Sequence, residues 1–197
     1  MRLILASQSA SRRAMLEAAD VPFEAMAAGV DEESAKASLI AGRTGARDLA
    51  DALAELKATK ISQRHPEALV LGCDQVASLG ERIFDKPASR EEAAEHLVAL
   101  AGETHRQTSA AVICESGRPI WRHVDVAKLT MRKLSDEFLA GYLDAEWPAV
   151  SGCAGGYRIE GRGAQLFTRI DGSHFTVLGM PLLPLLDYLR VREVIAA

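Results

Sequence analysis

The chain has 197 residues, with 23 Lys and Arg against 27 Asp and Glu, which gives a formal net charge of −4. An acidic chain lacks the basic surface that drives non-specific nucleic-acid binding, so we expect no nucleic-acid partner. The chain is 48% hydrophobic and 25% charged, which is typical of a globular domain and excludes an intrinsically disordered protein. We therefore predict one domain over residues 1–197.

No segment resembles a targeting or membrane-spanning sequence. The apolar opening at residues 3–6 is too short for a signal peptide, and no stretch reaches the length of a membrane span, so we expect a cytoplasmic protein without a membrane partner. The cysteines, Cys73, Cys114 and Cys153, are odd in number and widely spaced, which favours reduced thiols over disulfides or a zinc site. The five histidines show no metal-ligand spacing.

The first half of the chain predicts alternating strands and helices. In order, we expect a buried strand at 3–6, a polar turn at 7–11, a helix over 12–19, a second helix over 47–63, a buried strand at 69–73, and a hairpin over 75–84 that turns at Gly80-Glu81. The strand at 69–73 would place Asp74 at its carboxyl end. Open α/β sheets bind ligands at such ends.

The second half adds antiparallel pairing and three more helices. We expect a helix opened by the capping box Ser89 to Glu92 and ended by Gly102, an antiparallel pair over 107–114 and 120–131, a helix capped by Ser135, a hairpin turning at Asp171-Gly172, and a last helix entered through Pro181. These elements predict an α/β fold in which helices flank a mixed sheet and two lobes surround a cleft.

The turn between the first strand and helix carries two serines and two arginines that suit an anion. Ser7, Ser9, Arg12 and Arg13 combine hydroxyls and guanidiniums with a helix N-terminus, where phosphate binds well. The alternative is a serine cap followed by two exposed arginines. Neither a Walker loop nor a dinucleotide-binding fingerprint is present, so any phosphate would bind in another way.

Asp74 and Lys86 are further candidates, each with a simpler alternative. A carboxylate at a cleft holds a divalent metal or accepts a proton from an attacking water, whereas Asp74 also suits an ordinary turn. Lys86, beside Pro87, offers a compact positive charge to a phosphate or simply lies in solvent.

Three other segments carry weaker signals. The carboxylates of residues 31–33 would serve a metal or cap the next turn, and Lys57 and Lys60 on the second helix would face the cleft or solvent. The glycine-rich segment 155–161 lets backbone approach a ligand while Glu160 bonds a base edge, or is a plain connector.

Taken together, these segments resemble the Maf family of nucleotide pyrophosphatases, historically called septum formation proteins. The resemblance covers nearly the whole chain, in the order and spacing of several motifs rather than in one. The similar segments are residues 5–13, 30–32, 56–58, 72–76, 86–87, 100–102, 154–161 and 170–182.

The resemblance implies a Maf and inosine-triphosphatase type of fold, and hydrolysis of a nucleoside triphosphate between its α and β phosphates with Mg²⁺ or Mn²⁺. It implies that Asp74 activates water near the metal, with Glu32 or Glu33 as a further metal ligand. The residues that would bind the triphosphate are Ser7, Ser9, Arg12, Arg13, Lys57 and Lys86. A homodimer is also expected from the resemblance.

The resemblance also bears on the base. In this family Gln after the active Asp and Glu before the last glycine of the loop mark a branch that prefers 7-methyl-GTP, and this chain has Gln75 and Glu160. That branch has an aromatic residue where this chain has Ser11. We expect 7-methyl-GTP or another modified nucleotide, with dTTP or UTP as the alternative. A non-catalytic nucleotide-binding regulator of cell division is the alternative from another class.

Overall fold

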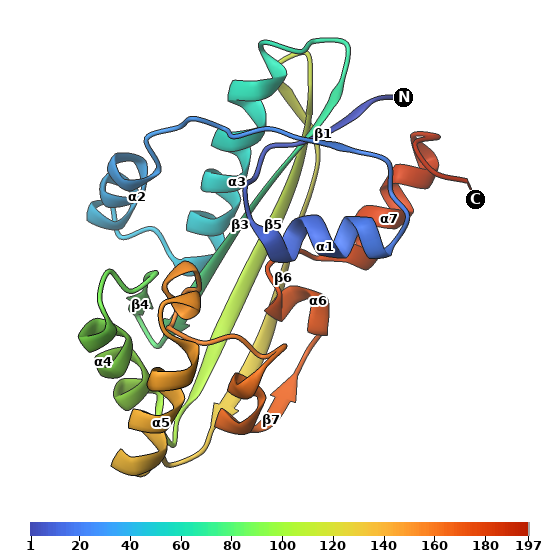
Figure 1. The fold of residues 1–197 in the computed structure, drawn as a ribbon. Coiled ribbons are helices and arrows are strands. Elements are labelled where there is room, and N and C mark those ends of the chain that lie inside the picture. Colours follow the sequence, from blue (N-terminus) through green and yellow to red (C-terminus); the bar gives the residue numbers. More distant parts are fainter. Residues whose placement is uncertain (197) are drawn as a thin grey trace. The chain divides into compact units, whose positions relative to one another are not determined.

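The computed structural model describes residues 1–196 as strands and helices in alternation (Figure 1). In chain order these are β1 (Leu3–Leu5), α1 (Ala10–Ala18), β2 (Glu24–Ala25), α2 (Glu32–Ala41), α3 (Ala46–Ser62), β3 (Leu69–Leu79), β4 (Arg82–Phe84), α4 (Arg90–Leu100), β5 (Thr104–Glu115), β6 (Arg118–Met131), α5 (Asp136–Glu146), the 3₁₀ turns η1 (Ala149–Gly152) and η2 (Arg162–Leu166), β7 (Phe167–Asp171), α6 (His174–Val177) and α7 (Leu182–Val191).

The strands form one seven-stranded mixed sheet in the order β2-β1-β3-β5-β6-β7, with β4 paired to β3. β1 runs parallel to both β2 and β3, whereas β4 is antiparallel to β3 and β7 is antiparallel to β6. The parallel strands β1, β2 and β3 are joined through helices, and the antiparallel strands β3 and β4 by a short turn, whereas β6 reaches β7 through α5, η1 and η2. The predicted class, a mixed α/β sheet flanked by helices, is confirmed.

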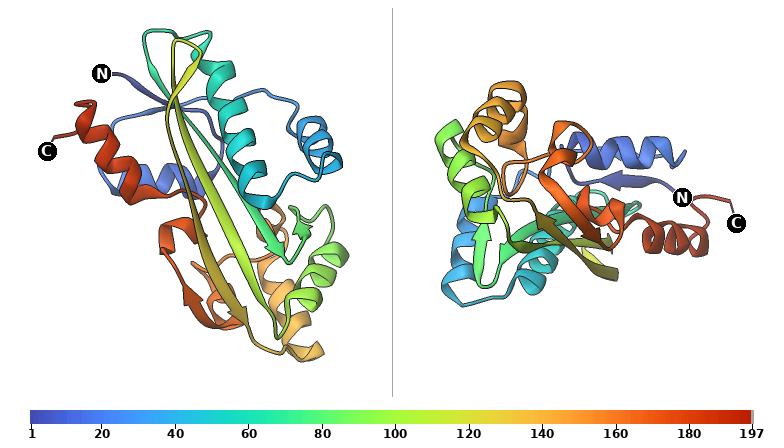
Figure 2. Two further views of the ribbon diagram at one scale, coloured as in Figure 1. Left: turned by 180° about the vertical axis from the view of Figure 1, so that it is seen from behind. Right: turned by 90° about the horizontal axis from the view of Figure 1, so that it is seen from below.

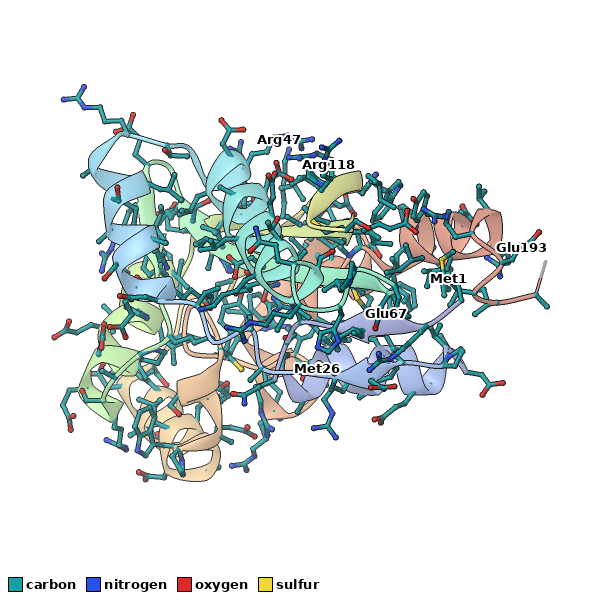
Figure 3. The ribbon with its side chains drawn as sticks, turned by 90° about the horizontal axis from the view of Figure 1, so that it is seen from above. Met1, Met26, Arg47, Glu67, Arg118 and Glu193 are labelled. Atoms are coloured by element: carbon teal, nitrogen blue, oxygen red, sulfur yellow. The ribbon has the colours of Figure 1, made fainter. Side chains whose placement is uncertain are left out.

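The described residues form two compact units. Unit 1 comprises Met1–Gln75, Thr108–Asp125 and the residues from Ser173 onward, and unit 2 comprises Val76–Gln107 and Val126–Gly172. The long strands β3, β5 and β6 therefore contribute residues to both. In unit 1 the first and last parts of the chain meet: Met1 and Glu193 lie toward the same end (Figure 3), and Arg192 Nη2 is 3.6 Å from Met1 Sδ.

The core of unit 1 has helices on both faces of the sheet. Leu16 of α1 and Leu185 of α7 pack in one cluster with Leu71 and Cys73 of β3, and these two helices lie side by side (Figures 1 and 2). Successive strand residues point to opposite faces. Gly72 therefore faces away from that cluster, toward α3.

The strand predicted to end at Cys73 is longer than expected. β3 continues through Asp74 to Leu79, because Ala77–Leu79 pair with β4 after a turn at Gly80. The polar pair Asp74-Gln75 looks like a strand end in the sequence, but Asp74 is buried and the strand runs through it. Asp74 thus lies within a strand, between Leu71, the last residue paired with β1, and Ala77, the first paired with β4. The predicted turn at Gly80 is confirmed.

The predicted hairpin at Asp171-Gly172 is wrong. β7 ends at Asp171, its partner is β6, and the chain enters α6 three residues later. Gly172 instead allows a close approach: its φ is +126°, and a Cβ there would lie 2.8 Å from Ala127 Cα.

Most predicted helix starts are confirmed by their caps. The hydroxyl of Ser89 accepts a hydrogen bond from Glu92 N, and that of Ser135 accepts one from Phe138 N. The first helix begins at Ala10 rather than residue 12, because Ser9 is its cap. α2 was not predicted; it has no buried residue, so it shows no apolar periodicity.

Within residues 1–196, no helix combines the length and the apolar character that crossing a membrane demands.

Candidate active site

The site in unit 1 begins with the close approach of α3 to β3. A Cβ on Gly72 would lie 2.1 Å from Ala54 O and 2.8 Å from Ala58 N, so only glycine allows the helix to lie this near the strand. Asp74 is two residues further along and points to the same face. Lys57, from the same stretch of α3, therefore reaches it.

Lys57 bridges two carboxylates. Its Nζ lies 2.6 Å from Asp74 Oδ1 and 2.9 Å from Glu32 Oε2, at the first residue of α2. Lys57 and Asp74 are both buried, at 7% and 6% exposed, while Glu32 is half-buried. Lys60, one turn along α3, donates to Gly29 O and so attaches the segment that leads to Glu32. Three residues far apart in sequence thus meet in one ion cluster, in which Lys57 and Asp74 are buried.

Burial raises the pKa of the Asp74 carboxyl, and the positive charges of Lys57 and Arg12 oppose that rise. A carboxylate with a raised pKa is a better proton acceptor than an exposed aspartate. The hydrogen bond from Lys57 also fixes the orientation of the group. Asp74 therefore has the properties of a general base.

The carboxylates of Asp74 and Glu32 also fit a divalent cation, which binds preferentially to carboxylate oxygens. They already share one cation, the Lys57 ammonium, so their oxygens converge on a common point. Asp31 does not take part in that convergence, because its carboxylate caps α2 by accepting from Ser34 N. Glu33 is exposed. No cluster of three or more His, Cys, Asp or Glu residues suited to a metal occurs within residues 1–196.

Arg12 is a buried structural link as well as a charge. Its Nη1 donates to Cys73 O at 2.9 Å and to Ser7 Oγ at 3.3 Å, and its Nε donates to Gly179 O at 2.9 Å. Arg12 therefore ties the β1–α1 turn and the Gly179 turn to the residue before Asp74. The predicted grouping of Ser7, Arg12, Lys57 and Asp74 exists in unit 1.

The other residues of the β1–α1 turn behave differently from Arg12. Ser9 caps α1, its Oγ lying 3.4 Å from Arg12 N. Arg13 is exposed and lines a surface depression with residues 17, 20–23 and 25. Ser11 is half-buried. The structure thus joins one of the two predicted arginines to the cluster around Asp74 and directs the other to the surface.

Gln75 forms hydrogen bonds that the sequence did not reveal. Its Nε2 donates to Thr176 O at 3.1 Å and to Val177 O at 2.8 Å, in α6. Ser109 Oγ also donates to Thr176 O, at 2.7 Å. The side chain next to Asp74 therefore holds the segment that leads to Gly179, the partner of Arg12.

Unit 2 contains the two remaining predicted residues. Lys86 and Glu160 are both exposed, and both act electrostatically on the Cys153 thiol, so they lie in one neighbourhood. Burial raises the pKa of Cys153, with Glu160 adding to the rise and Lys86 opposing it. Gly155 N donates to Asp85 O at 3.1 Å, which connects the glycine-rich loop (residues 153–161) to the residue before Lys86.

A buried polar network in unit 2 was not predicted from the sequence. Tyr157 Oη lies 2.6 Å from His105 Nε2 and 2.8 Å from Gln107 Nε2. β5 alternates between exposed and buried side chains over residues 104–107, but all four residues are polar, so the sequence shows no apolar alternation that would reveal the buried positions. A histidine and a glutamine on the buried face of a strand indicate a polar partner inside the protein.

Residues 2–192 match the profile of the family described as Maf-like protein. A relative from Ruegeria pomeroyi is 53% identical over 193 residues, covering 98% of this chain and 97% of its own length, and is named a nucleoside triphosphate pyrophosphatase. One from Hyphomonas neptunium, with the same name, is 49% identical and covers 99% and 98%. One from Mesorhizobium japonicum is 48% identical, covers 96% and 95%, and is named a 7-methyl-GTP pyrophosphatase.

Proposed function

Because the chain belongs to the Maf-like protein family, we propose that it is a nucleoside triphosphate pyrophosphatase, which converts a nucleoside triphosphate and water to the monophosphate and pyrophosphate. Relatives with this activity in their names match it over nearly their whole length. The observation that carries the proposal is the ion cluster of the buried Asp74 and Lys57 with Glu32. Such a cluster combines a proton acceptor, the Asp74 carboxylate, with a positive charge, the Lys57 ammonium, that can compensate the negative charge of a triphosphate.

In the proposed reaction Asp74 is the general base. A water oxygen forms a bond to the α-phosphorus, the bond from that phosphorus to the bridging oxygen breaks, and pyrophosphate leaves with the bonding electrons. The water proton passes to an Asp74 carboxylate oxygen. The raised pKa of this carboxyl supports the role, because it makes the carboxylate a stronger base.

The other residues neutralise and orient the triphosphate. Reactions of this type depend mainly on positioning and on compensating charge. Lys57 and Arg12 supply buried positive charge beside Asp74, and the Ser7 hydroxyl is held by Arg12. Asp74 and Glu32 would hold a divalent cation, Mg²⁺ or Mn²⁺, which when bound supplies charge neutralisation at the phosphates. We propose Lys86 as a further phosphate ligand.

For the base we propose 7-methyl-GTP or another modified nucleotide. The exposed Glu160 carboxylate suits the donor edge of guanine, and one relative is named for 7-methyl-GTP. Gln75 donates to two backbone carbonyls, which favours a role in shaping the site over contact with the base. That observation keeps dTTP or UTP as the alternative substrate.

A substrate panel tests both levels of the proposal. The purified protein is incubated with 7-methyl-GTP, GTP, dTTP and UTP and with Mg²⁺ or Mn²⁺, and kcat/KM is measured together with the phosphate product. Release of pyrophosphate supports the activity, and release of orthophosphate alone contradicts it. The highest kcat/KM for 7-methyl-GTP supports the base preference, and a clear preference for dTTP or UTP overturns it. Tight nucleotide binding without turnover would favour a non-catalytic regulator.

We also propose that the protein forms a homodimer, which sedimentation equilibrium tests.

Glu160→Gln isolates the base contact, because it removes charge and keeps shape. We expect the variant to lose kcat/KM for 7-methyl-GTP relative to UTP. Glu95→Gln, in α4, is the matched control.

A further inference from the structure

The glycine-rich loop of unit 2 is anchored by a buried tyrosine hydroxyl. Tyr157 is 4% exposed, and its Oη contacts His105 Nε2 at 2.6 Å and Gln107 Nε2 at 2.8 Å. His105 and Gln107 both belong to β5 and are themselves buried. Two neighbouring inward side chains of a rigid strand therefore bind one atom of the loop.

We assign the donors and acceptors of this network so that the tyrosine proton is also used. The Gln107 amide donates to Tyr157 Oη, and in this assignment the tyrosine hydroxyl donates its own proton to His105 Nε2. Burial lowers the pKa of His105 to about 4, which keeps the ring neutral, so one of its nitrogens is an acceptor, and we assign that role to Nε2. The ring proton then lies on Nδ1, which has no hydrogen-bond partner among residues 1–196. The network is thus directional, from Gln107 through Tyr157 to His105.

The backbone next to Tyr157 is held equally closely. Gly155 has φ +86°, and a Cβ there would lie 3.0 Å from Tyr157 Cε1, so the loop folds tightly over the ring. Gln107 Nε2 is also 3.3 Å from Ala154 O, and Gly155 N donates to Asp85 O. The anchor therefore extends from Tyr157 to the residue that precedes Lys86.

A second anchor lies on the other side of Tyr157. Arg158 Nη2 donates to Glu146 Oε2 of α5 at 2.9 Å, and Glu146 is 7% exposed. A Cβ on Gly163 would lie 2.0 Å from Arg158 O, so the chain beyond Glu160 also packs on this residue. Glu160, the exposed carboxylate of the loop, lies just beyond two consecutive anchored residues.

We propose that His105, Gln107 and Tyr157 are positioning residues that fix Glu160 and Lys86 for nucleotide binding. The inference rests on the proposed function, because it assigns those two side chains to the substrate. None of the three positioning residues contacts the nucleotide. Their effect is on the geometry of the loop, so they contribute to substrate affinity and not to the proton transfer at Asp74.

The test compares Tyr157→Phe with Tyr188→Phe. The first removes only the buried hydroxyl, and the second removes a hydroxyl that accepts from Arg192 in unit 1. For Tyr157→Phe we expect KM for the preferred triphosphate to rise about tenfold with kcat within about twofold, since it leaves buried partners unsatisfied. Tyr188→Phe is expected to keep both parameters. An unchanged KM, or a fall in kcat alone, would overturn the proposal.

Variants of His105 separate positioning from general loss of stability. His105→Gln keeps an acceptor for the tyrosine proton and is expected to keep KM near that of the wild type. His105→Leu removes the acceptor and is expected to match Tyr157→Phe. Equal KM values for the two variants, at equal thermal stability, would contradict a role for the hydrogen bond.

Cys153 reports on the loop without any turnover. It is the thiol of the loop and is half-buried, whereas Cys73 and Cys114 are fully buried. Tyr157→Phe is expected to speed its labelling by a maleimide, and Tyr188→Phe is not. If Tyr157→Phe is labelled faster than the wild type, but the wild type hydrolyses no triphosphate, the proposed function is refuted and the anchoring role of Tyr157 is supported. Wild-type turnover with unchanged labelling and KM in Tyr157→Phe would refute the anchor alone.

Discussion

Lys57 Nζ lies 2.6 Å from Asp74 Oδ1 in the interior of unit 1, and the same ammonium lies 2.9 Å from Glu32 Oε2. One positive charge on α3 therefore compensates two carboxylates from different elements. Removing either partner of a buried ion pair leaves a charge without compensation.

Lys57→Gln tests this dependence. We expect the free energy of unfolding to fall by about 3 kcal/mol, as for other broken buried pairs. We expect kcat/KM to fall by about 100-fold or more, because Asp74 loses its orienting hydrogen bond. Lys128→Gln, an exposed lysine of β6, is the control. Urea unfolding and steady-state kinetics measure both effects, and equal behaviour of the two variants contradicts the account.

Gly72→Ala tests the close approach of α3. The new Cβ would lie 2.1 Å from Ala54 O, so the helix must move away and Lys57 with it. We expect a loss of about 1–3 kcal/mol of stability from overpacking, and loss of most activity. Gly141→Ala, inside α5 with open space around its Cα, is expected to gain up to about 1 kcal/mol. Thermal unfolding shows whether each variant is less or more stable than the wild type. A stable, active Gly72→Ala would contradict the close approach of α3 to β3.

We predict that the folded protein loses stability in acid because of His105. Its pKa falls from 6.5 to about 4 on folding because of burial, so between these values the unfolded chain holds a proton that the folded chain lacks. The contribution of His105 to the free energy of unfolding is therefore fully present above pH 6.5 and is lost as the pH falls toward 4. Between pH 7.5 and pH 5 the loss amounts to about 2 kcal/mol.

The measurement is urea unfolding of the wild type and of His105→Gln at both pH values. Between pH 7.5 and pH 5, we expect the free energy of unfolding to fall by about 2 kcal/mol less in the variant than in the wild type. Identical losses would mean that His105 takes up no proton on unfolding in this range.

The three thiols are expected to differ in reactivity. Burial raises the pKa of Cys73 to about 11 and also raises that of Cys114, and both residues are fully buried. Mass spectrometry after brief maleimide treatment should therefore find label on Cys153 alone. A non-hydrolysable α,β-methylene triphosphate should slow that labelling if Lys86 and Glu160 bind it. Labelling of Cys73 at the same rate would contradict the structure of unit 1.

Local signals in the sequence predicted local structure well. Ser89 and Ser135 cap helices because a serine followed by acidic residues specifies a helix start through nearby atoms alone. α2 was missed for the converse reason, since a helix without buried residues has no apolar stripe. The end of β3 was misplaced because the polar pair Asp74-Gln75 interrupts the apolar run, so one strand was predicted as two.

The candidate site was predicted in its residues but not in its connections. Asp74, Lys57 and Glu32 were named separately, and only the fold reveals that one ammonium joins them. Arg12 and Arg13 look equivalent in the sequence, yet a step of 100° around a helix buries one and exposes the other. Hydrogen bonds between distant segments, such as those of Gln75 and Tyr157, have no local pattern.

The central claim is that Asp74 is the base of a reaction that releases pyrophosphate, and Asp74→Asn tests it most directly. The substitution keeps the size of the side chain and removes its capacity to take a proton. The measurement is the initial rate of pyrophosphate release from the preferred triphosphate at saturating metal, for wild type and variant at equal folded concentration. We predict steady release by the wild type and a loss of about 1000-fold or more in the variant, at the upper end of general-base effects because the substitution also weakens a proposed metal ligand. Release by Asp74→Asn at the wild-type rate would contradict the account.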